Sequence, residues 1–335
     1  MTDLEKTAYI LIRRKTAESR AELARKLGVS RPTASTVTES LLKAGLVREG
    51  GKGKSTGGAT PTLLCADEKA AYFIGIDFGY TDKMSAVLTD GSGSIIRKEE
   101  RNFDPADLSS MAENARILVR SLAADIPING IAVALSAVIN EESRQVRKSI
   151  NPLFCDGNFT EFLEKHLGYP VFPANRSRAA AISEAFGGAA DKEQDFALIS
   201  LGKSVGAAFW CGGGLFCGSG SSAGEIRNLR LPDGRRLETA LAREKTEKMD
   251  RKELAQLCAE ALSQIIDIMD IKLLVLSGRF ADFGSDFASL LEEQLAEHGS
   301  VKVRQAKFGR FSAARGSAFQ MAEIYISRDK LKQGS

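Results

Sequence analysis

The chain has 335 residues, of which 43% are hydrophobic and 27% charged, a composition typical of a soluble globular protein with two or three domains. It has no run of about 18–20 apolar residues, and residues 1–20 are charged and polar, so we expect no membrane span and no signal peptide and predict a cytoplasmic protein. Five cysteines without a C-x-x-C pair and two histidines argue against a zinc cluster, a disulfide framework and a histidine-centred nucleophile.

The net charge of +3 is unevenly distributed. Residues 1–60 contain 12 Lys and Arg against 6 Asp and Glu, a net charge of +6, whereas the remainder contains 34 against 37, a net charge of −3. A basic head on a mildly acidic body suggests that the head meets a polyanion. The alternative is a small domain that is merely well solvated.

Residues 1–66 are predicted to form a winged helix-turn-helix domain. Apolar residues recur at helical spacing over residues 3–15, which indicates an amphipathic first helix. Ser19, with Glu22 three residues later, has the capping-box pattern and opens a short second helix that runs through Leu27.

The third helix of the head is predicted to be the recognition helix. Gly28 makes the turn before it, Ser30 caps it, Pro32 lies in its first turn and Gly45 ends it. Its exposed face is expected to present polar side chains that can reach base edges, namely Arg31, Thr33, Ser35, Thr36 and Thr38.

A β-wing with a basic tip is predicted after this helix, leading out at Leu46–Arg48 and returning at Thr62–Leu64. The positive charge, the helix caps, the turn and the wing all indicate that the head binds double-stranded operator DNA. The predicted DNA-binding residues are Arg20, Arg31, Pro32, Thr33, Ser35, Thr36, Lys52 and Lys54. The alternative is a helical hairpin used for protein contacts.

The segment from Phe73 to Thr81 is predicted to be a buried strand that ends in an Asp77-x-Gly79-x-Thr81 turn. Backbone N–H groups in such a turn form an anion-binding concavity, and a carboxylate beside it suits a hydrated Mg²⁺. An ordinary β-hairpin turn with an Asp and a Gly is the alternative reading.

The body after this turn alternates strands with helices, which argues for the α/β class. The predicted strands include Gly130–Leu135, Phe196–Leu201 and Leu273–Leu276. The predicted helices include Leu108–Ala123, Phe159–Leu167, Arg178–Ala185, Ala255–Asp267 and Phe287–His298.

A winged helix followed by Gly75-Ile76-Asp77-Phe78-Gly79-Tyr80-Thr81 resembles the ROK family, which comprises repressors and sugar kinases with an actin-like ATPase fold. Family repressors carry such a head and family kinases lack it. The resemblance implies a two-lobed body, with residues 67–186 plus 310–335 as the small lobe and 187–309 as the large, dimerising lobe. The family's wing often ends in Gly-Arg-Arg-Pro, and this chain has Gly58-Ala59-Thr60-Pro61, so we expect a different operator preference.

The family's catalytic base is the Asp of Asn-Asp-Ala-Asn, and the same register here reads Asn175-Arg176-Ser177-Arg178. A sugar kinase needs a carboxylate that deprotonates the attacking hydroxyl. A guanidinium stays protonated in proteins and cannot take that role. The resemblance therefore implies a body without catalytic residues, and we expect no enzyme activity through the family mechanism.

Other family positions have changed as well. The two phosphate loops are predicted to be vestigial, at Asp77, Gly79, Thr81, Gly202 and Lys203. Glu225 lies in the Ala-Gly-Glu-Ile that binds sugar in the family, whereas Asn228 replaces the family's zinc- and sugar-binding His and the cysteine motif is missing. We expect neither a metal nor a cofactor.

Two readings of Arg176 and Arg178 stay open. In one, they hold an anionic effector, such as a phosphosugar or a sugar acid, by bidentate pairing in the cleft. The effector-binding set would then be Asn140, Asn175, Arg176, Arg178, Glu225 and Asn228. In the other, they pair with Glu184, Glu225 or other acids and plug a dead site.

The sequence predicts a DNA-binding transcriptional regulator of carbohydrate-related genes, most simply a repressor, whose body forms a homodimer or tetramer and senses a sugar-like effector. One alternative is a regulator whose body only oligomerises. A further alternative is a carbohydrate kinase with a displaced base, for which Asp77, Thr81 and Glu225 speak.

Overall fold

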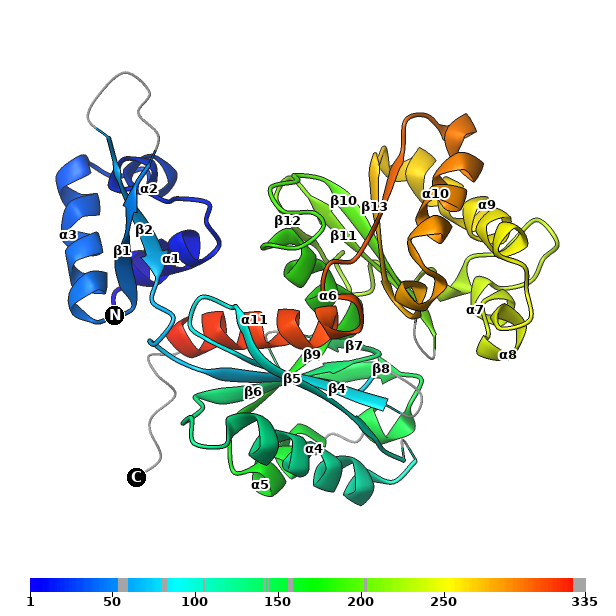
Figure 1. The fold of residues 1–335 in the computed structure, drawn as a ribbon, viewed down its shortest axis with the longest axis horizontal. Coiled ribbons are helices and arrows are strands. Elements are labelled where there is room, and N and C mark those ends of the chain that lie inside the picture. Colours follow the sequence, from blue (N-terminus) through cyan, green and yellow to red (C-terminus); the bar gives the residue numbers. More distant parts are fainter. Residues whose placement is uncertain are drawn as a thin grey trace.

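The computed structural model describes residues 1–53, 60–79, 83–104, 106–140, 143, 145–155, 159–201 and 204–327. Figure 1 shows a small head at one end and two separate sheets, each with its own helices, with α6 (Arg176–Ala185) and α11 (Ser312–Ser327) between them. No helix in the described part of the chain is long and apolar enough to cross a membrane.

The head consists of three helices and an antiparallel two-stranded wing: α1 (Asp3–Arg13), α2 (Arg20–Leu27), α3 (Arg31–Lys43), β1 (Val47–Lys52) and β2 (Thr62–Ala66). Ser19 and Ser30 cap α2 and α3 as predicted, each accepting a hydrogen bond from a backbone N–H three residues on. Gly28 between them adopts a left-handed φ of 66°, which glycine enters without steric strain. The head is therefore a winged helix-turn-helix.

The first sheet has the strand order β5-β4-β3-β6-β9 and supplies the turn at Asp77. Its members are β3 (Phe73–Asp77), β4 (Lys83–Thr89), β5 (Ile95–Asn102), β6 (Gly130–Leu135) and β9 (Val171–Asn175). Along β3, Ile74 and Ile76 face the helices α4 (Leu108–Ala123) and α5 (Phe159–Leu167), while Phe73 faces α11. Burial on both faces explains why β3 is apolar throughout.

The second sheet has the order β12-β11-β10-β13-β14. Its members are β10 (Phe196–Leu201), β11 (Val205–Cys211), β12 (Gly214–Phe216), β13 (Leu273–Gly278) and β14 (Lys302–Gln305). Ala197 and Ile199 pack on the side of α9 (Arg251–Met269) and α10 (Ser285–Gln294), whereas Phe196 and Leu198 belong to the core around α6. This alternation is the two-residue period of a strand.

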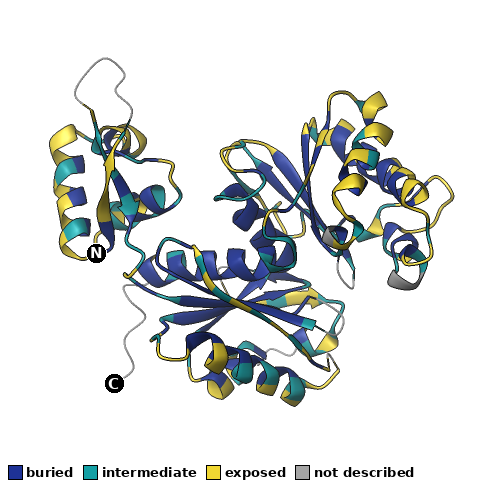
Figure 2. Cartoon of the chain, viewed as in Figure 1, coloured by how far each residue is buried: buried dark blue, intermediate teal, exposed yellow. Residues whose placement is uncertain are grey.

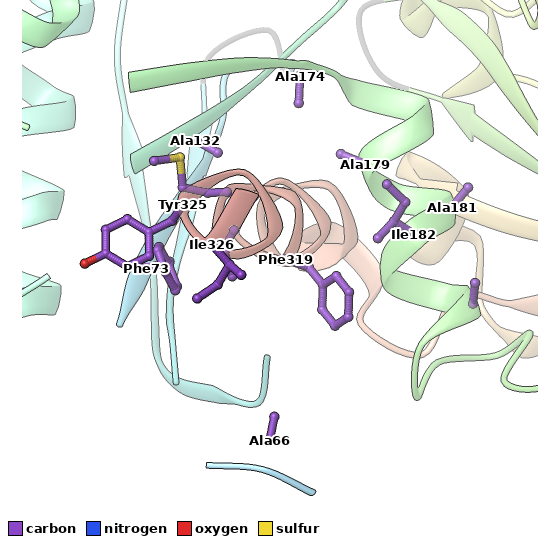
Figure 3. Close-up of a cluster of buried hydrophobic side chains, with 14 of the residues drawn as sticks. Ala66, Phe73, Ala132, Ala174, Ala179, Ala181, Ile182, Phe319, Tyr325 and Ile326 are labelled. Carbon is purple, nitrogen blue, oxygen red and sulfur yellow. The ribbon is translucent and has the colours of Figure 1, made fainter. Parts of the chain in front are cut away.

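The helices α6 and α11 cross closely in the middle of the molecule. A Cβ at Gly316 would lie 1.6 Å from the carbonyl oxygen of Ala179, and one at Gly75 would lie 1.8 Å from that of Ala314. Glycine at both places lets α11 press against α6 on one side and β3 on the other. Figure 3 shows α11 between the elements that carry Phe73, Ala132 and Ala179.

Short elements complete the described chain. They are the hairpin β7 (Ala137–Asn140) and β8 (Gln145–Ser149), the helices α7 (Leu237–Ala240) and α8 (Arg243–Thr246), and the 3-10 turns η1 (Pro152–Cys155), η2 (Ile226–Asn228), η3 (Arg279–Phe283), η4 (Ala296–His298) and η5 (Gly309–Phe311). The predicted fold class, a winged helix-turn-helix followed by a two-lobed α/β body, is confirmed.

Several predicted details were wrong. Glu22 accepts a hydrogen bond from the N–H of Glu18 rather than that of Ser19, so the capping box at Ser19 forms only its first half. The helix predicted over 287–298 ends at Gln294, and a separate 3-10 turn follows. The helix predicted from Ala255 begins at Arg251, because the side chain of Asp250 caps it by accepting the N–H of Lys252 at 2.8 Å.

Candidate DNA-binding face and interlobe site

The outer face of α3 presents most of the side chains predicted to reach DNA. Arg31, Pro32, Thr33 and Thr36 are exposed, and Ser35 is half-buried. Figure 2 shows an exposed outer side along this helix. Within the described part of the chain, Arg31 forms no hydrogen bond and no ion pair, so its five N–H donors can bind a partner.

Thr38 was wrongly predicted to belong to this exposed face. Its side chain is fully buried, and its hydroxyl donates a hydrogen bond to the carbonyl of Ala34 at 2.8 Å. Ala34, Val37, Thr38 and Leu41 share the inward face of α3, because residues three and four apart lie on the same side of a helix. Thr38 is a core residue whose hydroxyl the helix backbone satisfies.

Arg20 already has a partner in the head. Both of its Nη atoms lie 3.2 Å from Oε1 of Glu49, which joins α2 to the wing. Such an exposed ion pair contributes about 0–1 kcal/mol, so a phosphate could replace the carboxylate at little cost. Lys52 is exposed at the end of β1, and Lys54 lies outside the described residues.

In the cleft between the two sheets, Arg176 forms a buried ion pair with Asp77. The Nε atom of Arg176 lies 3.0 Å from both carboxylate oxygens, and its Nη1 donates to Oγ of Ser200 at 2.9 Å. The exposed fraction is 5% for Arg176 and 0% for Asp77. Both charged groups are therefore removed from water and are satisfied by each other.

The side chain of Arg176 also fills the turn at Gly79. A Cβ at Gly79 would lie 1.9 Å from Cδ and 2.1 Å from Nε of Arg176, so glycine is required there to admit the arginine. The N–H of Gly79 donates to Oδ1 of Asp77 at 2.7 Å. The described part of this turn, whose sequence pattern could hold phosphate and Mg²⁺, holds a guanidinium instead.

Burial raises the pKa of the Asp77 carboxyl, and the charge of Arg176 together with the N–H of Gly79 opposes that rise. Removing the guanidinium would leave the carboxylate buried without a counter-charge. Arg176 and Asp77 thus form a buried ion pair that carries no net charge.

The remaining residues of the predicted effector site do not all meet. Asn175, Arg176 and Glu225 line one cavity of about 40 Å³ between the sheets. That volume holds one or a few water molecules rather than a hexose. Glu225 pairs there with Arg227, at 3.2 Å between Oε2 and Nε.

Asn140, Arg178 and Asn228 are not part of this cavity lining. The side chain of Asn140 accepts a hydrogen bond from the N–H of Ser143, and Asn228 is exposed. Arg178 is 2% exposed, and its Nη2 donates to the carbonyl of Cys217 at 3.3 Å. Asn175 caps α6 by accepting the N–H of Arg178. Asn140, Asn175 and Arg178 therefore hold loops and a helix end in place.

The ion-pair partner of Arg176 differs from the two acids named from the sequence. Glu184 is fully buried, but it accepts hydrogen bonds from the N–H groups of Ala189, Lys307 and Phe308 and from the hydroxyl of Ser312. Asp77 and Arg176 were both singled out, yet their pairing was missed, and so was Ser200. Thr81, Gly202 and Lys203 lie outside the described residues.

The fold and the cleft together define a class of protein. It has a winged helix on a two-lobed α/β body, and an arginine fills the turn at Asp77 and Gly79. The chain belongs to the ROK family, whose model matches residues 73–238. Similar curated proteins are the xylose repressors of Caldicellulosiruptor bescii, 29% identical over 225 residues, and of Bacillus spizizenii, 27% identical over 218 residues. Each alignment covers 64% of this chain, and the chain spans only 55–56% of the length of these relatives.

A solved structure supports the same fold over the whole chain. It is described as a ROK family transcriptional regulator, a homologue of the Escherichia coli MLC protein, and it matches with a TM-score of 0.74 and 18% identity over 98% of both chains. At that identity the match establishes the fold alone.

Proposed function

We propose that the chain is a DNA-binding transcriptional regulator, most simply a repressor, whose head reads operator DNA. The observation that carries this proposal is the exposed face of α3, with the unengaged Arg31 at its N-terminal end and the basic β1 strand beside it. The names of the curated relatives, xylose repressors, point to the same role and to carbohydrate-related target genes.

The body takes no part in phosphoryl transfer in this proposal. Arg176 stands where the family resemblance places the catalytic base, and it also fills the turn at Gly79. A kinase with a displaced base would need the Asp77 turn to accept phosphate, which the buried ion pair opposes.

For the effector, the geometry favours a body that oligomerises without binding a sugar in the cleft. The cavity of about 40 Å³ at Asn175, Arg176 and Glu225 is too small for a sugar in this conformation. A thermal-shift screen with neutral sugars, sugar acids and Mg·ATP tests this preference, because a ligand at 100 times its Kd adds about 2.7 kcal/mol to the free energy of unfolding. A shift with a sugar that Glu225→Gln abolishes would restore the sugar-sensing hypothesis.

A symmetric homodimer is the assembly we propose, because two helix-turn-helix heads related by a two-fold axis read half-sites about one helical turn apart. Light scattering coupled to size-exclusion chromatography distinguishes a dimer from a tetramer and from a monomer. A monomer at micromolar concentration on and off DNA would contradict this part of the proposal.

The DNA-binding role is tested by fluorescence anisotropy on a duplex selected from a random library. Arg31→Ala should weaken binding by the equivalent of about 1–3 kcal/mol and relax preference at one base position. Lys52→Ala should weaken binding to all sequences and reduce the slope of log K against log salt by about 1.

Lys165→Ala is the matched control, because Lys165 is an exposed lysine on α5, on the far side of the first sheet. It should leave DNA binding unchanged. If Arg31→Ala and Lys52→Ala both bind like the native chain at fixed salt, the head assignment is wrong.

A further inference from the structure

A cavity of about 570 Å³ lies where the head meets the body. Its walls come from α1, β1 and β2 of the head and, in the body, from the turn before β5, the segment after α6, the segment before η5, and α11. The volume falls within the range of about 300–1,000 Å³ that small-metabolite sites occupy. We call it the junction cavity; it is separate from the small cavity beside Arg176.

The lining of the junction cavity is strongly cationic. Its cationic members are Arg13, Arg14, Lys15, Arg48, Lys307 and Arg315, and its acidic members among the described residues are Glu68 and Asp191. Arg14 and Arg48 are paired with Glu323 and Glu68. The other four are the cations of interest.

Arg13 enters this region from the head. It is 3% exposed, its Nε donates to the carbonyl of Gly91 at 2.9 Å, and its Nη1 donates to that of Phe319 at 3.0 Å. Its guanidinium carbon lies 3.7 Å above the ring of Phe319. Its Nη2 is buried and has no hydrogen-bond partner among the described residues.

Arg315 enters from the body and, like Arg13, donates to backbone carbonyls rather than to a carboxylate, although Glu184, Asp90 and Asp191 lie close enough to act on its charge. It is 6% exposed, and its Nη1 and Nη2 donate to the carbonyls of Ser183 and Phe186 at 2.9 and 3.0 Å. Burial lowers the pKa of Arg13 and lowers that of Arg315 to about 10. Within the described part of the chain, neither guanidinium forms an ion pair with a carboxylate.

Two buried guanidiniums without a carboxylate partner are unusual, because buried charges in proteins are normally paired. We propose that the junction cavity binds a small phosphorylated metabolite, whose anionic group supplies the missing counter-charge to Arg13 and Arg315, with Lys15 and Lys307 at the rim. The anion acts on the two guanidiniums through their charge, because most of their N–H groups already donate to carbonyls. The exposed ammonium groups of Lys15 and Lys307 are the ones that can touch it directly.

Such a ligand would join the two parts of the molecule. Arg13 and Lys15 belong to the head, and Lys307 and Arg315 belong to the body, so one bound anion attracts both. It would hold the head in the docked orientation and change the spacing of two heads in a dimer. This effect on DNA rests on the proposed function, whereas the binding of the anion does not.

The binding is tested with the full chain by isothermal titration calorimetry, using inorganic phosphate, pyrophosphate and glucose 6-phosphate as probes. The double variant Lys15→Gln with Lys307→Gln removes two exposed rim charges and should weaken the binding of the tightest probe by about tenfold, or about 1.4 kcal/mol. Arg315→Gln should abolish it, and circular dichroism reports whether that variant is folded.

The matched control is Lys165→Gln with Lys302→Gln, which removes two exposed, ion-paired lysines far from the cavity. It should leave the Kd unchanged. Three results would overturn the proposal: no saturable binding of any probe at millimolar concentration, an equal loss in the control, or a loss in Arg31→Ala but not in the rim variant. The last result would place the anion on the DNA-binding face.

The same variants separate this proposal from the proposed function. If the chain binds DNA but no anion, the proposed junction site is wrong and the proposed regulator function stands. If the chain binds the anion at the junction but no DNA, the proposed regulator function is wrong and the proposed junction site stands. If both occur, the probe should change the affinity for DNA in the native chain and not in the rim variant.

Discussion

The interlobe cleft and the head–body junction both contain buried arginines, but the groups that accept hydrogen bonds from these arginines differ. In the cleft, Arg176 meets the carboxylate of Asp77 with Nε 3.0 Å from both oxygens. At the junction, Arg13 and Arg315 meet carbonyl oxygens and aromatic rings. In the cleft the buried arginine has an ion-paired carboxylate, and the cavity beside it is small. At the junction carboxylates pair with Arg14 and Arg48, no ion pair is formed by Arg13 or Arg315 among the described residues, and the cavity is large.

Under the proposal for the junction, an arginine that fills the turn at Asp77 does not make the whole fold insensitive to anions. A phosphate turn can be closed by a single side chain that supplies its own positive charge to the turn's carboxylate. A second surface, built from a domain added to the body, can offer uncompensated charge elsewhere. The contrast predicts how substitutions in the two regions should behave.

The largest effect is expected for Arg176→Met. The variant leaves the Asp77 carboxylate buried without its cation, which should lower the free energy of unfolding by about 3–5 kcal/mol at pH 7, measured by urea denaturation. Adding Asp77→Asn should restore much of the loss, because an apolar side chain and a neutral amide then replace the pair. Equal stability of the single and double variants would show that the ion pair is not the cause.

The same variant should respond to pH. Burial raises the pKa of Asp77, and without Arg176 it should rise further, so the folded state takes up a proton before the unfolded state does. The loss relative to the native chain should therefore shrink as pH falls from 7 towards the unfolded-state value of about 3.9, and it should return as pH rises through the raised pKa.

A somewhat smaller effect is expected for Gly79→Ala. The added methyl group would lie 1.9 Å from Cδ of Arg176, so the arginine has to leave the turn. We expect a loss of about 1–3 kcal/mol, as for other overpacked sites. In an Arg176→Ala background the same change should cost less, with the 2.8 Å approach to Oδ1 of Asp77 remaining, and a double-mutant cycle measures this coupling. Additive losses would contradict the filled turn.

Arg13→Met should have a smaller effect than Arg176→Met, although both arginines are buried. It removes two hydrogen bonds, to the carbonyls of Gly91 and Phe319, but it leaves no ion-paired carboxylate without its cation. We expect a loss of about 1–2 kcal/mol in urea denaturation without added anion. A loss as large as that of Arg176→Met would mean that an internal carboxylate compensates Arg13 after all.

The smallest effect is expected for Glu323→Gln. This residue pairs with Arg14 across the junction, at 2.7 and 2.6 Å, but Arg14 is 35% exposed, so solvent screens the pair. We expect a loss of about 0.5 kcal/mol that disappears in high salt. A larger, salt-insensitive loss would make this pair, rather than Arg13, the main anchor of the head.

The parts of the molecule governed by local patterns could be predicted from the sequence. Ser19, Gly28 and Ser30 mark helix ends through their own backbone preferences, and the predicted strand at Gly130–Leu135 matches β6 to the residue. The failure at Thr38 is also local. A threonine hydroxyl that bonds the backbone four residues earlier can be buried like a valine, and polarity alone hides this.

The interlobe pair and the junction cavity could not be predicted in this way. Asp77 and Arg176 are 99 residues apart and meet because β3 and β9 flank β6 in one sheet, and α6 begins where β9 ends. Arg13 and Phe319 are 306 residues apart and meet through the docking of α1 on α11. Such contacts follow from topology, which composition and periodicity of one sequence do not encode.

The buried carboxylate of Glu184 has a mechanical consequence. The chain passes from one sheet to the other along residues 186–195 and returns along 306–311. Glu184 accepts hydrogen bonds from both connecting segments. Its donors are the N–H of Ala189 on the outward path and the N–H groups of Lys307 and Phe308 on the return path. Glu184 therefore ties the outward and return crossings to the end of α6, and separating them there requires breaking its hydrogen bonds.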